Sequence, residues 1–317
     1  MKKIIWIHPK HLDLKKLIKS NFKKYTSKIL FIEQNEDKLI RKEIRNAEVL
    51  INCPTSYFNK NFIRTAKKLK WIHFGGAGVE KILIDELKKS KIILTNGKII
   101  QGPELADHTL SLILYFTRNL GSFLNKPKIY KRPIELKGKK FGILGGGGAG
   151  ICIAEKLKSF DTKVRIFDDD LLPILSFIDE YYDSSEILEN ISDLDFIISA
   201  LPLTKFTKNL INKNFLDKMK KNSILINISR GQIINFKDLV SNKRYKKFKG
   251  IGLDVTNPEP LPINNELRYA NNVVLTNHTA GLSDHNRSRS ISLIFTNIKR
   301  YFLGRPLLNV VDKTRGY

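Results

Sequence analysis

The sequence predicts an α/β protein with two domains, each built on a doubly wound parallel β-sheet. Its 317 residues are too many for one small core and are typical of two domains of ordinary size. Short apolar runs typical of strands alternate with Lys-rich amphipathic segments from residue 2 to about residue 100. A second alternating series begins near residue 141, and a glycine-rich loop follows its first strand, where doubly wound sheets bind nucleotides.

The composition is that of a globular protein without extensive disorder. Hydrophobic residues make up 42% of the chain and charged residues 27%. The two cysteines, Cys53 and Cys152, belong to neither a CxxC motif nor a Cys/His cluster, so we expect no disulfide framework and no metal site. This cysteine usage fits a cytoplasmic protein, and no stretch approaches the roughly 18 apolar residues that a membrane span needs.

The formal charge of +25, from 56 Lys+Arg against 31 Asp+Glu, raises the alternative of a nucleic-acid-binding protein. The excess is mostly lysine spread over the whole length, and no recognised nucleic-acid motif accompanies it. We interpret it as a compositional bias and expect neither a nucleic acid nor a membrane as partner. The positive field should still attract small anions and dinucleotides, with an association that depends on salt.

The first series predicts four strands and leads to a long helix. The apolar run at residues 4–7 is too short for a signal peptide, so we expect a first strand there, followed by strands at 29–32, 49–51 and 71–74. A helix is predicted over 104–116, because it begins just behind a proline and is apolar on nearly every face, as a helix buried between layers would be.

The second series follows an expected extended connector at residues 126–140, which contains two prolines and seven basic residues. We expect helices around 154–157 and over 290–303. The apolar runs predict strands at 141–144, 164–167, 196–198, 223–227, 250–253 and 273–275.

The glycine loop at residues 145–150 matches G-x-G-x-x-G between a strand and a helix. Gly145 allows the tight turn, Gly147 lets the backbone approach a pyrophosphate, and Gly150 lets the helix pack on the strand. Asp168 follows the next strand, where a carboxylate can bind a ribose 2′-hydroxyl and repel a 2′-phosphate, which favours NAD over NADP. The alternative is a flexible turn followed by a solvated acidic cluster.

Three polar side chains follow later strands of the same series and suggest a hydride-transfer site. Arg230 can grip and polarise an anionic oxo acid, His278 can deliver or remove a hydroxyl proton, and Glu259 can hold that imidazole oriented and basic. Each alone has an ordinary explanation, as a surface arginine, a structural histidine or a loop carboxylate. The functional interpretation depends on their joint appearance after successive strands of one nucleotide-binding sheet.

Taken together, these motifs resemble the D-isomer-specific 2-hydroxyacid dehydrogenase family over nearly the whole chain. The resemblance also includes the segments 77–80, 104–108, 200–204 with Thr207, and 304–312. It implies a Rossmann-type NAD-binding domain at 104–283, inserted into a flavodoxin-like substrate domain formed by 1–103 and 284–317. It also implies a homodimer, with the long helix and the arm at 126–136 as contributors, and no appended regulatory domain is expected after Asp312.

The resemblance further implies roles for individual residues. Arg230, Glu259 and His278 correspond to the family's catalytic residues, and the backbone amides of Ala77 and Gly78 to the groups that bind the substrate carboxylate. Asp254 and the carbonyl of Ile228 correspond to groups that hold the nicotinamide carboxamide. The cofactor-binding residues implied are Gly145, Gly147, Gly148, Ala149, Gly150, Asp168, Pro202, Thr207, Ile228 and Asp254.

The implied reaction is the NADH-dependent reduction of a small 2-oxo acid, with glyoxylate or hydroxypyruvate as the expected substrate. Residues 51–56, expected to face the substrate, contain no Arg or Lys to clamp a phosphate, which disfavours phosphoglycerate. A related dehydrogenase acting on phosphoglycerate, formate or phosphonate, and a non-catalytic NAD-sensing protein of the same fold, remain alternatives.

Two residues and one segment depart from the family pattern. Asn277 stands where proline is usual, Gly148 stands where a larger residue is usual, and the 126–136 arm lacks a tryptophan. These departures affect cofactor affinity and the dimer arm more than the reaction class.

Overall fold

The computed structural model describes residues 3–10, 23–121, 132–170 and 173–317, and they form two compact units. Unit 1 combines residues 1–98 with residues 287–317, and unit 2 comprises residues 99–286. Unit 2 begins before the boundary expected at residue 103/104. Gly102 explains this, because a Cβ at Gly102 would lie only 2.6 Å from Cys152 Sγ and 2.8 Å from the Gly148 carbonyl oxygen, both in unit 2.

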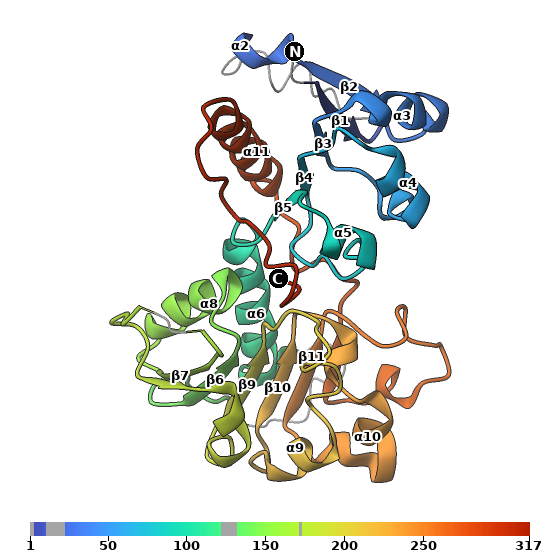
Figure 1. The fold of residues 1–317 in the computed structure, drawn as a ribbon. Helices are drawn as coiled ribbons and strands as arrows, with labels where there is room; N and C mark the ends of the chain where they lie inside the picture. The colour runs from blue at the N-terminus through green and yellow to red at the C-terminus, as the bar shows by residue number, and fades with distance from the viewer. Residues whose placement is uncertain (1–2, 11–22, 122–131, 171–172) are drawn as a thin grey trace. The chain divides into compact units, whose positions relative to one another are not determined.

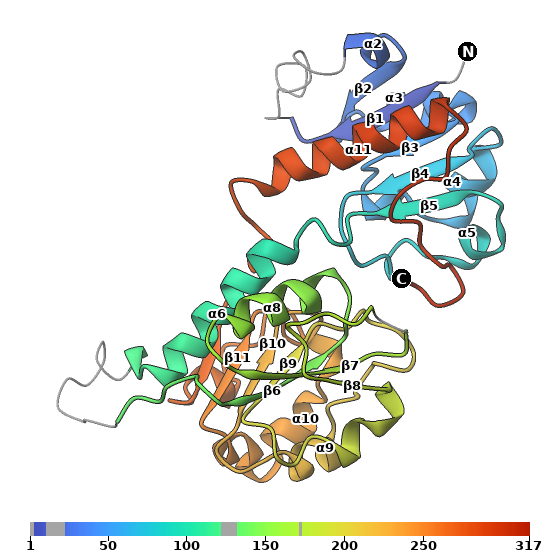
Figure 2. The same cartoon turned by 90° about the vertical axis from the view of Figure 1, so that its left-hand side faces the viewer.

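Unit 1 contains a five-stranded parallel sheet in the order β2-β1-β3-β4-β5, which is the flavodoxin-like order. Its helices lie on both faces (Figures 1 and 2). The strands are β1 (Ile4–His8), β2 (Ile29–Glu33), β3 (Val49–Ile51), β4 (Trp71–Phe74) and β5 (Ile93–Asn96); the helices are α2 (Lys23–Thr26), α3 (Asp37–Glu43), α4 (Lys60–Thr65), α5 (Asp85–Lys89) and α11 (Asn286–Phe302).

Two cores hold unit 1 together, one on each face of this sheet. Residues of α3, α4 and α5 pack on one face, and the buried Ile294, Phe295 and Ile298 of α11 cover the other, against Trp6 and Trp71. Strands buried on both faces are expected to read as continuous apolar runs, as β1 and β3 do.

Unit 2 contains a seven-stranded parallel sheet in the order β12-β11-β10-β9-β6-β7-β8, a Rossmann-type order with its switch point between β6 and β9. Helices α6 and α8 cover one face and α9 and α10 the other (Figure 2). The strands are β6 (Lys140–Leu144), β7 (Lys163–Phe167), β8 (Glu180–Tyr182), β9 (Phe196–Ser199), β10 (Ile224–Asn227), β11 (Gly250–Leu253) and β12 (Val273–Leu275); the helices are α6 (Gly102–Thr117), α8 (Gly148–Lys158), α9 (Lys213–Lys218) and α10 (Phe236–Val240).

The predicted fold class, two parallel-sheet α/β domains with one of Rossmann type, is confirmed by these two sheets. The strands β5 and β8 were not predicted. β8 has three partly exposed residues and no apolar run, so its sequence lacks the pattern of a buried strand. β5 is buried at Leu94, Thr95 and Asn96 and exposes Ile93 at 41%, and its second half is polar. The connector predicted at 126–140 lies partly outside the described residues.

Candidate active site

The glycine loop joins β6 to α8 at the switch point of the unit 2 sheet. Gly145 has a φ of 98°, which favours glycine, and a Cβ at Gly150 would lie 2.0 Å from the Gly145 carbonyl oxygen. A Cβ at Gly147, the residue that precedes the first turn of α8, would meet no atom within 4 Å. The loop is therefore closely packed on its inner side and open where α8 begins, as a pyrophosphate site at a helix N-terminus requires.

Gly148, where the family usually carries a larger residue, has a local explanation. A Cβ there would lie 2.6 Å from the Cα of Ile99, whose own backbone has a φ of 79°. Glycine is therefore required because the chain entering α6 passes directly over this position. Ala149 lies beside it in the first turn of α8.

Asp168 follows β7 and contacts the glycine loop directly. Its Oδ2 accepts a hydrogen bond from the Gly146 amide at 2.6 Å, and its Oδ1 accepts one from the Asp170 amide at 2.8 Å. Two more carboxylates follow in sequence, and Asp169 accepts a hydrogen bond from the Ser184 hydroxyl. This end of β7 is thus acidic beside the loop.

Arg230 ends a tight turn that starts at the last residue of β10. The Asn227 side chain accepts hydrogen bonds from the amide and hydroxyl of Ser229, at 3.1 and 2.7 Å, and donates one to the Arg230 carbonyl at 2.9 Å. The Ser229 hydroxyl also contacts that of Ser199 at the end of β9, at 2.9 Å. These contacts fix the turn at the carboxyl edge, and Arg230 Nη1 donates to the Ser229 carbonyl at 2.8 Å.

The next residue joins the Arg230 turn to the loop that carries Glu259. A Cβ at Gly231 would lie 1.9 Å from the carbonyl oxygen of Thr256, so the two backbones touch and only glycine fits. The amide of Thr256 in turn donates to Glu259 Oε2 at 3.4 Å. The loops after β10 and β11 are therefore packed together at the same edge.

His278 and Glu259 are brought together directly. His278 Nδ1 lies 2.7 Å from Glu259 Oε1, and the two side chains are 49% and 43% exposed. An ionised carboxylate can only accept, so Nδ1 carries the proton in this contact, in which Nε2 takes no part. Such exposure makes the pair worth about 1 kcal/mol or less in stability, so its value lies in orienting the imidazole.

Asp254 holds the loop that carries His278. Its buried carboxylate accepts hydrogen bonds from Thr276 Oγ1 at 2.6 Å and from the amides of Thr279 and Ala280, each at 3.0 Å. Its backbone carbonyl accepts the His278 amide at 2.9 Å. His278 has a φ of 53°, a left-handed conformation unusual for a residue with a side chain, and these bonds surround it on both sides.

The remaining predicted cofactor residues lie after β9 and β10. Thr207 Oγ1 donates to the Pro202 carbonyl at 2.6 Å and accepts from the Thr204 amide at 2.8 Å, which closes a tight loop after β9. Ile228 follows Asn227 in the Arg230 turn, and its side chain is buried.

Ala77 and Gly78 lie in unit 1, in the loop after β4. The Asn96 side chain donates to the Ala77 carbonyl at 2.5 Å, and the Gly97 amide donates to the Gly76 carbonyl at 3.0 Å, so the loop is tied to the end of β5. Within the described residues, the amides of Ala77 and Gly78 donate no hydrogen bond. A carboxylate could accept a hydrogen bond from each of these two amides.

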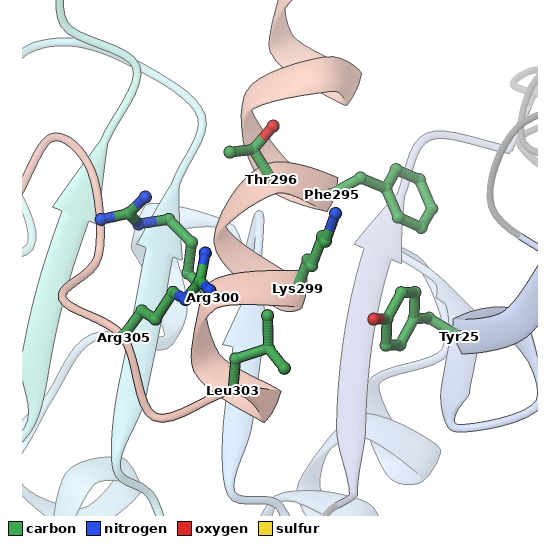
Figure 3. Close-up of a pocket in the computed structure, with 7 residues that line it drawn as sticks. All are labelled: Tyr25, Phe295, Thr296, Lys299, Arg300, Leu303 and Arg305. Carbon is green, nitrogen blue, oxygen red and sulfur yellow. The ribbon is translucent and has the colours of Figure 1, made fainter.

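A cavity of about 330 Å³ lies elsewhere in unit 1, beside the C-terminal half of α11 (Figure 3). Its lining consists of Tyr25, Phe295, Thr296, Lys299, Arg300, Leu303 and Arg305, and none of the predicted site residues. Lys299 and Arg300 stand in the last turn of α11, where cations offset the negative end of the helix dipole. The helix dipole thus accounts for two of the three cations that line the cavity, whereas Arg305 lies beyond the end of α11.

No role was predicted from the sequence for Asn227, Thr276 or His108. Asn227 shapes the Arg230 turn, and Thr276 binds Asp254. His108 Nε2 lies 3.0 Å from Thr276 Oγ1 and 3.6 Å from Asp254 Oδ1. The role of Asn227 is local to its own turn. The roles of His108 and Thr276 depend on contacts between α6 and the ends of β11 and β12, which no local motif signals.

This fold and site define a nicotinamide-type dehydrogenase architecture, and comparisons with known proteins identify the family. The family model described as the D-isomer specific 2-hydroxyacid dehydrogenase NAD binding domain matches residues 112–280, more than half of the chain. The chain belongs to the D-isomer specific 2-hydroxyacid dehydrogenase family, whose members are oxidoreductases acting on CH–OH donors.

Named relatives and a solved structure agree with this assignment. A glyoxylate reductase from Thermofilum pendens is 31% identical over 299 residues, covering 88% of this chain and 85% of the relative. The human glyoxylate reductase/hydroxypyruvate reductase is 29% identical over 284 residues, covering 85% of each chain. The structure of a D-isomer specific 2-hydroxyacid dehydrogenase from Xanthobacter autotrophicus Py2, in complex with NADPH and MES, superposes with a TM-score of 0.85 at 22% identity over the whole of both chains.

No helix in the described part of the chain is long and apolar enough to cross a membrane.

Proposed function

We propose that the protein reduces a small 2-oxo acid, glyoxylate or hydroxypyruvate, to the D-2-hydroxy acid with NADH. The observation that carries this proposal is the 2.7 Å contact between His278 Nδ1 and Glu259 Oε1, at the edge of the sheet where the Arg230 turn also ends. An imidazole held by a carboxylate and accompanied by a guanidinium is the set of groups that a carbonyl reduction requires.

The chain's own residues supply binding, charge stabilisation and the proton. Arg230 binds the substrate carboxylate and stabilises the negative charge that develops on the carbonyl oxygen. His278 donates its Nε2 proton to that oxygen, and Glu259 stabilises the imidazolium beforehand. The amides of Ala77 and Gly78 are available to bind the carboxylate. A bound nicotinamide supplies the hydride to the carbonyl carbon.

The glycine loop fits a dinucleotide, and Asp168 supports NAD over NADP. The space beyond Gly147 admits a pyrophosphate at the start of α8, while Asp168 and its acidic neighbours would repel a 2′-phosphate. The relative from Xanthobacter autotrophicus was solved with NADPH, so the preference proposed here rests on Asp168 itself.

A small substrate is supported by the segment that follows β3. Residues 51–56 contain no Arg or Lys, so a phosphate on the far end of the substrate would find no partner there. Glyoxylate and hydroxypyruvate, which carry one carboxylate and no phosphate, fit this composition.

We also propose a homodimer, which light scattering of the purified protein would test.

Purified protein with NADH and a panel of 2-oxo acids tests the function. We expect rapid oxidation of NADH with glyoxylate or hydroxypyruvate, little with bulkier acids, and less with NADPH. His278→Ala should lose at least about a hundredfold in kcat while it still binds NADH, because the proton donor is removed. His285→Ala, which alters an exposed histidine seven positions further on, is the matched control and should keep its activity.

Two outcomes would contradict the proposal. Turnover that survives His278→Ala would remove the histidine from the mechanism. NADH binding without turnover of any acid in the panel would favour the NAD-sensing alternative.

A further inference from the structure

The face of α6 that packs on β11 is in register with that strand. His108, Leu112 and Phe116 occur every four residues along α6, so they share one face of the helix. A Cβ at Gly250 would lie 2.4 Å from the Phe116 ring, and one at Gly252 would lie 3.1 Å from Leu112 Cδ1. Four residues of helix span about 6 Å and two residues of strand about 6.6 Å. Every fourth residue of α6 therefore stays opposite every second residue of β11.

After Phe116 with Gly250 and Leu112 with Gly252, the third pair in this series is His108 with Asp254. Asp254 lies two residues beyond Gly252, directly after β11, and His108 lies one turn before Leu112. The histidine is therefore held at this place by the packing of α6, with Nε2 3.6 Å from Asp254 Oδ1. Its side chain is 19% exposed and that of Asp254 is 1% exposed.

The hydrogen bonds from His108 have one direction. Thr276 Oγ1 donates to Asp254 Oδ1 at 2.6 Å, because an ionised carboxylate can only accept. The same oxygen of Thr276 then accepts the Nε2 proton of His108 at 3.0 Å. The chain of bonds runs from α6 through Thr276 to the carboxylate that holds the amides of Thr279 and Ala280 on one side of His278.

We propose that His108 is a positioning residue, which acts through Thr276 and Asp254 to fix the left-handed backbone of His278. This inference rests on the proposed role of His278. A non-glycine residue with a φ of 53° needs neighbours that hold it, and proton transfer loses about a hundredfold when the donor moves by about 1 Å. His108 ties the loop to a helix that packs across the sheet.

Steady-state kinetics of two substitutions test the proposal. His108→Leu removes the donor and should lower kcat for glyoxylate by about tenfold to a hundredfold, with the KM for NADH within about twofold of the wild type. His108→Gln places an amide donor near the position of Nε2 and should restore most of the loss. A kcat for His108→Leu within twofold of the wild type, or a loss that glutamine does not recover, would overturn the proposal.

Thr276→Val removes the middle of the chain at nearly constant shape. It should lower kcat as His108→Leu does, and the double variant should lose about as much as either alone, because both break one connection. Additive losses would show that His108 does not act through Thr276. Leu112→Ala is the control on the same face of α6, which should lower the melting temperature but keep the kcat of the folded enzyme.

A measurement that needs no turnover separates this proposal from the proposed reaction. The imidazole nitrogen resonances of His278, assigned with His278→Ala, should shift in His108→Leu and return in His108→Gln. If the His278 resonances shift in His108→Leu but the wild-type protein turns over no oxo acid, the proposed reaction is refuted and the positioning role is kept. Unchanged resonances would refute the positioning role whatever the activity.

Discussion

At the scale of single residues, the candidate site separates into groups that a motif reveals and groups that only packing reveals. Arg230, Glu259 and His278 each follow a strand, so their meeting at one sheet edge could be predicted from the sequence. Asp254 was assigned to the nicotinamide, and that role stays a proposal. The structure adds that both of its carboxylate oxygens bind the His278 loop, which depends on bonds between β11 and β12 that no local pattern encodes.

Gly147→Ala should separate cofactor binding from stability. The new Cβ would meet no atom within 4 Å, so we expect a loss of about 1 kcal/mol or less in the free energy of unfolding. The methyl group would stand where the pyrophosphate approaches, so the Kd for NADH should rise by at least about tenfold. Thermal unfolding and NADH fluorescence titration measure the two effects. An unchanged Kd would place the phosphates elsewhere.

Asp168→Asn should shift the cofactor preference. Asparagine keeps an acceptor for the Gly146 amide and removes the negative charge that opposes a 2′-phosphate. The ratio of kcat/KM for NADPH to that for NADH should rise by about tenfold, measured with the same oxo acid. If the ratio stays constant, Asp168 does not face the ribose.

At the scale of elements, the order of strands and helices follows closely from the apolar runs, whereas the edge strands β5 and β8 do not. A strand buried on both faces is expected to carry a continuous apolar run, as β1, β3 and β9 do. β8 lies at an edge, where partners cover less of it, and its sequence Glu-Tyr-Tyr carries no such signal. The beginning of α6 likewise depends on Gly102 meeting α8, a contact made in three dimensions.

Gly250→Ala should test the packing of α6 on β11. Its Cβ would lie 2.4 Å from the buried Phe116 ring, so the helix or the ring must shift, and overpacking of this kind costs about 1–3 kcal/mol. Urea unfolding followed by circular dichroism measures the loss. Gly147→Ala, which meets no neighbour, is the matched control. A stability equal to that of the wild type would mean that α6 can move without cost.

At the scale of the whole molecule, each unit has its own sheet and its own pair of cores, so their stabilities can be followed separately. Both tryptophans of the chain, Trp6 and Trp71, lie in unit 1, and their fluorescence reports its unfolding. The sequence predicted two domains from length and from the repeated alternation of strands and helices. The bonds that fix their boundaries, such as that of Asn309 to the Lys98 carbonyl, join residues far apart in sequence.

Unit 1 should lose stability as the pH falls from 6.5 to 4. Burial lowers the pKa of His73, on β4, from 6.5 to about 4. Between these values the unfolded chain binds a proton that the folded chain excludes. The free energy of unfolding therefore falls as the pH falls, and at pH 4 it is lower by about 3 kcal/mol than at neutral pH. The hydrogen bond from Arg41 lowers the pKa of Asp37 below 3.8, so that carboxyl titrates below this window.

Urea unfolding followed by tryptophan fluorescence measures this dependence. His73→Asn keeps a polar atom near Thr95 but cannot titrate, so its stability should change less across the window. His285→Ala, at an exposed histidine, should keep the wild-type slope. Equal slopes in the wild type and His73→Asn would mean that another group causes the loss.

The helix that covers one face of the first sheet follows the whole of unit 2 in the sequence. Ile4, Trp6, Val49, Ile51 and Trp71 form the apolar face that α11 covers. The ribosome synthesises all of unit 2 after the strands of that face and before α11. This takes about 10–40 s at roughly 5–20 residues per second. For that time the nascent chain exposes a two-tryptophan surface, and its risk of aggregation during synthesis is set by translation speed and chaperone capture rather than by the stability of the finished fold.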